Sequence, residues 1–262
     1  MEEKKLIKIK LSTFLMIILS IIILIIGLVM YKFYNDKTTE IEKSIDINNS
    51  IVKNAYAKVE GASDAMYEYV NTKKSNLPNK IKLVLAYHNS KQEGLKPYNY
   101  DEFLQTGNSY YLPTETLKNS VKDVLGNDIT FINGSFEAER IGLGEKVKYN
   151  EQQNRYDTNF EFGGDSDYFA ETIVSASTQG DYLNIYVKPV FFKIEAEKYG
   201  ISDSNKYDAY SNYDYNNNEF LNIVQEKVFD INDIDISKLD TYKYIFLKQG
   251  DNYYFDSLQK VK

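Results

Sequence analysis

An uninterrupted apolar run at residues 11–30 restricts this chain more than any other feature of its sequence. The run contains no charged residue and consists almost entirely of Ile, Leu, Met, Phe and Val, with Ser12, Thr13 and Ser20 as its only hydroxyl residues. A helix of that length, at ~1.5 Å per residue, spans roughly 30 Å, which is the thickness of a bilayer's hydrocarbon core. The sequence therefore predicts a transmembrane helix over residues 11–31.

The residues on either side of the run predict an uncleaved signal anchor and its orientation. A secretory signal peptide has a shorter apolar region and a small-x-small cleavage site. This run instead leads into Tyr31-Lys32-Phe33-Tyr34, with aromatic side chains typical of a membrane interface. Four lysines lie in residues 1–10, against Lys32 and Lys37 after the run. This asymmetry predicts a single-pass protein of the cell membrane, with a cytoplasmic N-terminal tail and an extracellular C-terminal domain.

The composition beyond the membrane excludes several partners and chemistries. Setting aside the four lysines and two glutamates that precede the run leaves 27 basic and 36 acidic residues, a net charge of about −9. Such a surface repels phosphate backbones, so no nucleic acid is expected as a partner. The chain has no cysteine, which excludes disulfides and thiol catalysis. Its richness in Ile, Lys, Asn and Tyr, together with a signal anchor, indicates a low-GC Gram-positive bacterium.

Residues 32–75 are predicted to form a membrane-proximal helical segment, because apolar residues recur there at spacings of about three and four. Written as heptads, these residues form two columns: Ile45, Val52, Val59 and Met66 in one, and Ile41, Asn48, Ala55, Ala62 and Tyr69 in the other. Two alternatives stay open. The helix packs on its own domain, or residues 41–69 self-associate as a parallel coiled coil. The small alanines and Gly61 favour the first alternative.

Residues 76–262 are predicted to form one extracytoplasmic α+β domain, with helices first and antiparallel strands after them. Thr114 and Gly126 mark the ends of a helix, while residues 82–87 fit either a short strand or an apolar helical turn. Another short helix is expected around Phe220 to Phe229. Polar turns separate strand-like segments into three hairpins: residues 146–150 with 155–162, 169–178 with 182–195, and 242–248 with 253–258.

This order of helices and strands resembles the NTF2-like fold, in which helices lie against a strongly curved antiparallel sheet and leave a pocket. Residues 239–248 and 251–261 also resemble the ends of uncharacterised membrane-anchored proteins from Gram-positive bacteria. The resemblance covers about residues 110–262 and includes no catalytic motif. Since that fold hosts enzymes, binding modules and assembly domains, the resemblance implies a pocket without specifying an activity.

The only histidine, His88, is expected to be partly exposed at the end of an element. A single histidine excludes metal sites that need a histidine pair, and we expect no metal, no cofactor and no catalytic residue. Asp214, Asn216 and Asn218 resemble the beginning of a calcium loop, but the pattern fails at Glu219, so a solvated turn is the preferred interpretation.

Four short segments that resemble functional motifs are interpreted as structural. Ser50-Ile51-Val52-Lys53 and Ser257-Leu258-Gln259-Lys260 match the Ser-x-x-Lys pattern of penicillin-interacting enzymes but lack its companion motifs. Two glycine-containing segments are interpreted as turns, Gly142-Leu143-Gly144 and Gly163-Gly164-Asp165-Ser166-Asp167.

The chain has 24 tyrosines and no tryptophan. Because tyrosine combines an apolar ring with a hydroxyl, it suits both interfaces and polar ligands. The candidate interaction surface is Tyr207, Tyr210, Tyr213 and Tyr215; the alternative is that these side chains fill the strands of a sheet.

Two functional hypotheses follow from these observations. The preferred one is a membrane-anchored binding or assembly domain, without a catalytic site, for a protein or cell-envelope partner. The alternative is an NTF2-like pocket enzyme that uses a carboxylate and tyrosines for proton transfer. A closed apolar pocket converging on one buried carboxylate favours the enzyme, whereas a filled core with an exposed tyrosine patch favours binding.

Overall fold

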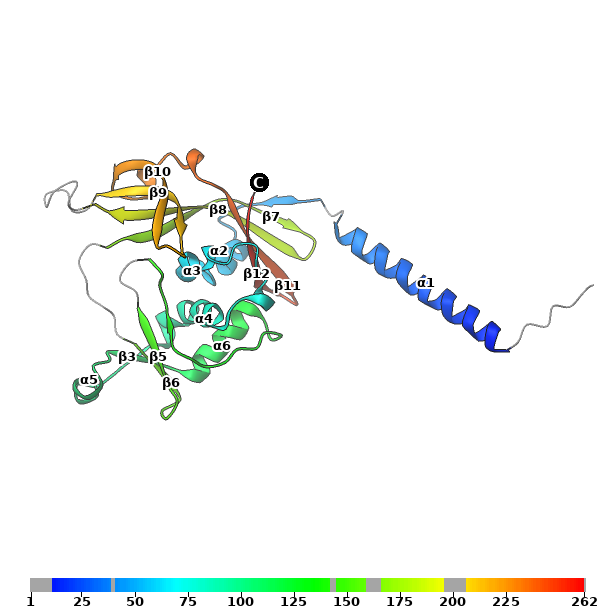
Figure 1. Cartoon of the computed structure of the whole chain (residues 1–262), viewed down its shortest axis with the longest axis horizontal. Coiled ribbons are helices and arrows are strands. Elements are labelled where there is room, and N and C mark those ends of the chain that lie inside the picture. Colours follow the sequence, from blue (N-terminus) through cyan, green and yellow to red (C-terminus); the bar gives the residue numbers. More distant parts are fainter. Residues whose placement is uncertain (1–10, 39–40, 142–144, 159–165, 196–205, 262) are drawn as a thin grey trace, which may run out of the picture. The chain divides into compact units, whose positions relative to one another are not determined.

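The structure, a computed structural model, describes residues 11–38, 41–141, 145–158, 166–195 and 206–261 of the chain. The chain divides into an N-terminal unit that ends at Glu42 and a compact unit from Lys43 onward. In the first unit, helix α1 runs from Leu11 to Thr38 (Figure 1). Within the described part of the chain, no helix is identified as long and apolar enough to span a membrane. The predicted cytoplasmic tail, residues 1–10, lies outside the described residues.

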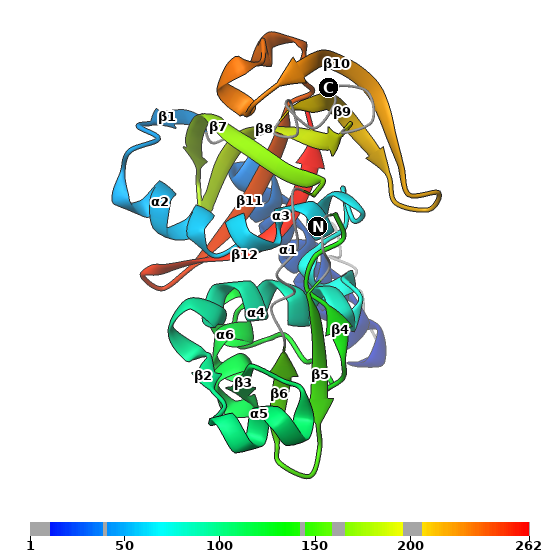
Figure 2. The ribbon, with the colours of Figure 1, turned by 90° about the vertical axis from the view of Figure 1, so that its left-hand side faces the viewer.

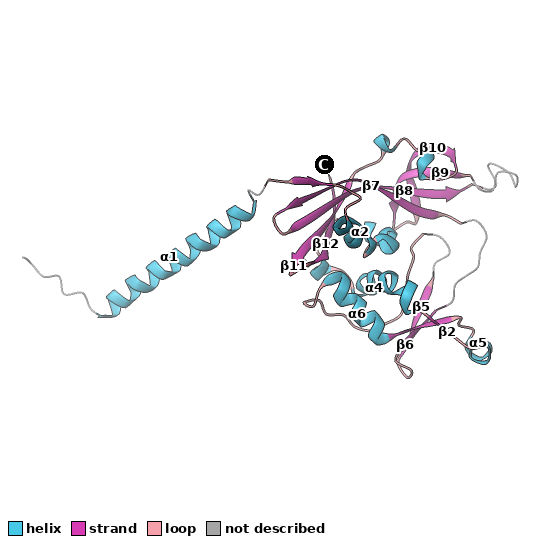
Figure 3. Ribbon diagram, turned by 180° about the vertical axis from the view of Figure 1, so that it is seen from behind, coloured by secondary structure: helices cyan, strands magenta, loops and turns pink. Residues whose placement is uncertain are grey.

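The unit from Lys43 onward combines helices with antiparallel sheets, which confirms the predicted α+β class (Figure 3). Its helices and single-turn 3-10 helices are α2 (Ser50–Ala57), η1 (Glu60–Ala62), α3 (Ser63–Tyr67), η2 (Lys74–Asn76), α4 (Asn79–Gly94), α5 (Tyr100–Thr106), α6 (Thr114–Leu125), η4 (Ile231–Asp233) and η5 (Ile236–Lys238). Its strands are β1 (Lys43–Ile45), β2 (Lys96–Pro97), β3 (Tyr110–Pro113), β4 (Phe136–Glu137), β5 (Lys146–Asn150), β6 (Arg155–Thr158), β7 (Tyr168–Gln179), β8 (Tyr182–Ile194), β9 (Tyr207–Asp214), β10 (Glu219–Val228), β11 (Tyr242–Gln249) and β12 (Asn252–Lys260). The expected NTF2-like cone is not confirmed by this arrangement.

The larger sheet has seven strands and is branched at β8. Its main path is β1-β7-β8-β11-β12, and β9 pairs with both β8 and β10. Strand β7 pairs along one edge of β8. Along the other edge, residues 182–187 of β8 pair with β11, and residues 191–194 pair with β9. One long strand therefore supports two separate hairpins.

The β7–β8 and β11–β12 hairpins confirm two of the predictions and turn on the same dipeptide, Gly-Asp. Gln179 pairs with Tyr182 and Gln249 pairs with Asn252, so each turn contains two residues. Gly180 and Gly250 have φ values of 59° and 62°. Because this left-handed conformation is strained for residues with a Cβ atom, the glycines set the position of both turns.

The smaller sheet has five strands in the order β2-β3-β6-β5-β4. Its β5–β6 hairpin confirms the third prediction over residues 146–150 and 155–158, while residues 159–162 lie outside the described residues. Helix α6 begins at Thr114 and ends before Gly126, as predicted. It packs against α4, and both helices contact β3 (Figure 2).

A single large apolar cluster joins the helices to both sheets. It includes Val52 and Val59 from the first helical turns, Leu85 from α4, Tyr156 from the smaller sheet and Phe246 from the larger one, all fully buried. A second, smaller cluster lies around Val190, Phe192 and Val228. Most of the buried apolar side chains therefore belong to one core that the helices and both sheets share.

The predicted continuous helix over residues 41–69 is wrong. Lys43–Ile45 forms β1, which pairs with β7, and the helical part is divided into α2, η1 and α3. The apolar columns arise because Val52, Ala55, Val59, Ala62 and Met66 are buried in the domain's own core. This burial agrees with the alternative that the segment packs on its own domain, and it moves the domain's start from residue 76 to Lys43.

Contacts with distant segments determine the secondary structure of two other segments, residues 82–87 and Phe220–Phe229. Residues 82–87 belong to the middle of α4, whose apolar residues are buried on several sides by α6, α3 and the smaller sheet. The helix expected around Phe220–Phe229 is wrong, because these residues form strand β10 and its end. Pairing with β9 determines the conformation of this segment. The register shifts between Ile223 and Gln225 and again between Gln225 and Val228, where Lys227 adopts a φ value of 59°.

Candidate functional site

Tyrosine hydroxyls hold carboxylates at several places inside the domain. The largest such cluster surrounds Glu171 on β7. Tyr56 donates to Glu171 Oε1 and Tyr67 donates to Oε2, each at 2.7 Å, and the Tyr244 hydroxyl lies 3.3 Å from both oxygens. Because these tyrosines come from α2, α3 and β11, one half-buried carboxylate ties the helical cover to two strands of the larger sheet.

Two further carboxylates in the other half of the domain repeat this arrangement. Tyr87 donates to buried Glu145, which also accepts a hydrogen bond from Thr158 at 2.8 Å. Tyr98 donates to buried Asp157, which also accepts one from Arg155 Nε at 3.1 Å. Several of the chain's many tyrosines therefore lie inside the domain, where their hydroxyls donate hydrogen bonds to carboxylates.

Burial and the neighbouring carboxylates keep these phenols protonated. Desolvation is the main cause that raises the pKa of Tyr56, Tyr67 and Tyr87, and the negative charge of Glu171 or Glu145 raises the pKa further. These hydroxyls therefore act as hydrogen-bond donors at neutral pH and not as bases.

The four tyrosines of the predicted interaction surface lie along β9 and just after it. All four are partly buried: Tyr207 packs on the smaller apolar cluster, and Tyr210, Tyr213 and Tyr215 pack on the larger one. These contacts agree with the alternative interpretation, in which the tyrosines fill the strands of a sheet. Tyr213 and Tyr215 nevertheless line a pocket, whereas Tyr207 and Tyr210 do not.

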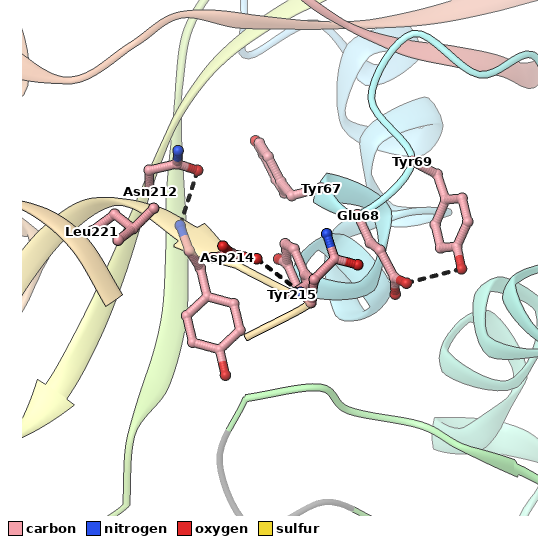
Figure 4. Close-up of a pocket in the computed structure, with 9 residues that line it drawn as sticks. Tyr67, Glu68, Tyr69, Asn212, Asp214, Tyr215 and Leu221 are labelled. Carbon is pink, nitrogen blue, oxygen red and sulfur yellow. Dashed lines mark hydrogen bonds between the residues drawn. The ribbon is translucent and has the colours of Figure 1, made fainter. Parts of the chain in front are cut away.

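This open pocket, here called the tyrosine pocket, lies between α3 and the β9–β10 hairpin and has a volume of about 430 Å³ (Figure 4). It is lined by Tyr67, Glu68, Tyr69, Asn212, Tyr213, Asp214, Tyr215, Asn216 and Leu221. Among the described residues, four aromatic rings, two amides and two carboxylates therefore line one opening, together with the aliphatic side chain of Leu221. Because the Tyr67 hydroxyl reaches Glu171, the pocket adjoins the carboxylate cluster under the sheet.

Comparison with known proteins finds no matching family model, curated protein or solved structure.

The charged groups of the pocket are engaged by the chain itself. Glu68 Oε2 lies 3.3 Å from the Arg140 guanidinium, and Glu68 Oε1 accepts a hydrogen bond from Tyr69 at 3.1 Å. The contact with Arg140 is an ion pair without a well-aligned hydrogen bond, since Glu68 Oε2 has no hydrogen-bond partner within the described residues. Arg140 also lies over the Tyr215 ring, 5.9 Å from its centroid.

Asp214 stabilises its own turn, as the solvated-turn interpretation predicts. Its carboxylate accepts hydrogen bonds from the backbone of Asn216 at 2.9 Å and from the backbone and side chain of Asn217 at 3.2 and 2.9 Å. The Asn217 side chain is the largest cause that lowers the pKa of Asp214, followed by the two backbone donors. Among the described residues, no group of three or more acidic or histidine side chains is placed to hold a metal ion.

The remaining sequence patterns do not form a site. Ser50 begins α2 and is exposed, whereas Ser257 is buried in β12. Lys260 is an odd number of residues from Ser257 on that strand and pairs with Asp240. Gly142-Leu143-Gly144 and residues 163–165 lie outside the described residues, while Asp167 accepts a hydrogen bond from the Ile194 backbone at 2.8 Å.

The expectation that His88 is partly exposed at the end of an element is wrong in its position. His88 lies in the middle of α4, and its Nε2 is 2.8 Å from the Ala138 carbonyl oxygen. A carbonyl can only accept, so Nε2 carries the proton. A Cβ atom on Gly61 would lie 3.0 Å from Nδ1, so a larger residue at that position would require His88 to shift.

Burial of His88 is expected to make the domain acid-sensitive. Desolvation, and then the charge of Lys91, lower the pKa of His88 from 6.5 to about 4. Between these two pKa values the unfolded state binds a proton at His88 that the folded state does not bind. The contribution of neutral His88 to the free energy of unfolding is therefore complete above pH 6.5 and is lost as the pH falls to about 4. The expected loss is about 3 kcal/mol.

Urea unfolding of wild type and His88→Gln at pH 7, 5.5 and 4 measures this effect. Glutamine places an N–H near the position of Nε2 but does not titrate. The free energy of unfolding of His88→Gln should therefore fall less than that of wild type between pH 7 and pH 4. Parallel curves for the two proteins would assign the acid sensitivity to the carboxylates instead.

Proposed function

We propose that this chain is a single-pass membrane protein whose extracytoplasmic domain binds a partner in the cell envelope through the tyrosine pocket. The anchor is supported by the uncharged sequence of residues 11–30 and by their helical conformation in α1. The described side chains of that helix, Met16 and residues 18–30, are exposed and almost all apolar. Such a surface is stable in lipid and costly in water.

The observation that carries the binding function is the lining of the tyrosine pocket. Its carboxylates already contact Arg140, Tyr69 and the turn at Asn217. Among the described residues, the Tyr213 hydroxyl, the Asn212 side-chain N–H groups and the Asn216 amide are left for a partner. Aromatic and hydrogen-bonding groups without a reactive acid or base are typical of a binding site.

The alternative, an NTF2-like enzyme, has one observation in its favour: Glu171 and its three tyrosines combine the residue types that such a proton-transfer site needs. However, the three tyrosines whose hydroxyls contact Glu171 come from α2, α3 and β11, so the cluster already has a structural role in joining these elements. The tyrosine pocket is open, and Glu171 is not among its lining residues. We therefore prefer the binding function.

A single experiment on protoplasts tests both the location and the pocket. Gram-positive protoplasts that produce the full chain are expected to bind fluorescent fragments of their own cell wall. External protease should remove both the domain and the bound fragments. Leu221→Arg should reduce binding at least tenfold, because Leu221 lines the pocket and lies outside both apolar clusters of the described residues.

The matched control is Ile223→Arg, which makes the same change two residues further along β10. Ile223 is half exposed and does not line the pocket, so this variant should bind as wild type does. A domain protected from protease would contradict the topology. Equal binding by the Leu221→Arg and wild-type proteins would contradict the role of the pocket.

A further inference from the structure

We propose that the tyrosine pocket recognises an uncharged saccharide, so that the envelope partner is a glycan. This inference rests on the proposed function and specifies its ligand. It follows from which groups of the pocket are engaged within the chain and which are left open.

The first step is the charge of the ligand. A cation would be held by Glu68 or Asp214 and by the tyrosine faces. Arg140 already pairs with Glu68 and lies over Tyr215, so the chain's own cation occupies that position. The carboxylate of Asp214 accepts three N–H donors of its turn. An anion is disfavoured by the same two carboxylates, so an uncharged ligand fits best.

The second step is the chemistry of the open groups. Among the described residues, the Tyr213 hydroxyl, the Asn212 side-chain N–H groups and the Asn216 side-chain amide have no hydrogen-bond partner. Desolvation raises the pKa of Tyr213, so its hydroxyl stays protonated and can both donate and accept. Amide and phenol groups match sugar hydroxyls, which also donate and accept.

The third step is shape. The volume of about 430 Å³ falls within the range of small-ligand sites and suits one or two sugar rings. A pyranose has an apolar C–H face that packs on an aromatic ring, with hydroxyl groups around its edge. The pocket is likewise lined by tyrosines and by the side-chain amides of Asn212 and Asn216. A peptide side chain, by contrast, would need a deeper apolar pocket than Leu221 and the tyrosine edges provide.

The test uses full-length protein in a detergent without a sugar headgroup. Calorimetric titration compares the tetramer of N-acetylglucosamine with the tetramer of glucosamine, because the two differ only in acetyl groups and therefore in charge. The neutral tetramer is expected to bind at least tenfold more tightly than the cationic one. Tyr213→Phe should weaken its binding about fivefold, the effect of one lost hydrogen bond.

Tyr213→Phe is a clean variant because its hydroxyl has no hydrogen-bond partner among the described residues, so the fold should be unaffected. Tyr182→Phe, which removes the hydroxyl of an exposed tyrosine on β8, is the matched control and should bind as wild type does. Tighter binding of the cationic tetramer, or neutral binding unaffected by Tyr213→Phe, would overturn the inference.

Treated wall fragments separate failure of this inference from failure of the proposed function. Fragments stripped of protein should still bind protoplasts that produce the chain, whereas fragments with cleaved glycan strands should not. If only the protein-stripped fragments lose binding, the partner is a protein: the saccharide inference fails and the binding function stands. If no fragment binds, both fail.

Discussion

Truncation after Leu239 is expected to abolish cooperative unfolding of the domain, because it removes β11 and β12. Strand β11 lies between β8 and β12 in the larger sheet, and the hairpin contributes Tyr244, Phe246 and Phe255 to the core, each with no exposed surface. Aromatic side chains bury roughly 150–250 Å² each, so at ~25 cal/mol per Å² each contributes about 4–6 kcal/mol before entropy. Two such losses approach the stability of a typical domain, ~5–15 kcal/mol.

A single substitution gives a graded version of the same test. Phe246→Ala should reduce the free energy of unfolding by about 3–5 kcal/mol, since the site is fully buried and cannot collapse onto a smaller side chain without moving Tyr244 and Phe255. Lys248→Ala, at an exposed position of the same strand, should change it by less than about 0.5 kcal/mol. Chemical denaturation measures both. A truncated protein that melts near the full-length temperature would show that the hairpin is an appendage.

Glu171→Ala is expected to cost about 2–4 kcal/mol, because it leaves the hydroxyls of Tyr56, Tyr67 and Tyr244 without their common acceptor. The lower part of the range allows for the partial exposure of Glu171 and for entering water. Glu171→Gln keeps one acceptor oxygen and should cost less.

A double-mutant cycle assigns the cost of Glu171→Ala to the hydrogen bonds rather than to lost packing. In a Tyr67→Phe background the substitution should cost at least about 0.5 kcal/mol less than in wild type, because one hydroxyl no longer needs an acceptor. Strictly additive effects would mean that the Tyr67 hydrogen bond contributes nothing to stability.

The elements that were predicted correctly are those with a local chemical signal. The hairpins at Gly180 and Gly250 are marked by glycines in a conformation that glycine favours, and α6 is marked by an apolar face that ends at Gly126. In each case the deciding residues lie within a few positions of one another. Alternation and turn chemistry were therefore sufficient.

The elements that were predicted wrongly depend on distant partners. Phe220, Leu221 and Val224 have spacings that suit a helix, and only pairing with β9 makes the segment a strand. The apolar columns of residues 45–69 suit one long helix, but β1 pairs with β7, more than 120 residues away. His88 was expected at the end of an element, yet it lies within α4, where its Nε2 contacts the carbonyl of distant Ala138.

The candidate site was half predictable for the same reason. Tyr213 and Tyr215 stood out because tyrosine is concentrated around them, and both line the pocket. The opposite wall, Tyr67 to Tyr69, comes from α3 and the residue pair after it, which no local signal connects to β9. The pairing of Glu68 with Arg140, which determines the charge of the pocket, likewise joins segments that are distant in sequence.

The tyrosine–carboxylate contacts also bear on how the domain reaches its fold. They close chain loops of 58, 59, 104 and 115 residues, the sort of long-range closure that a disulfide provides in many exported domains. A hydrogen bond needs no oxidant, and a wrongly paired tyrosine releases its carboxylate far faster than a mispaired disulfide exchanges. Closing such loops costs chain entropy, so these contacts are expected to form after the local hairpins and helices. In a chain without cysteine, these hydrogen bonds are thus expected to join distant segments late in folding, and incorrect pairs are expected to exchange quickly for the native ones.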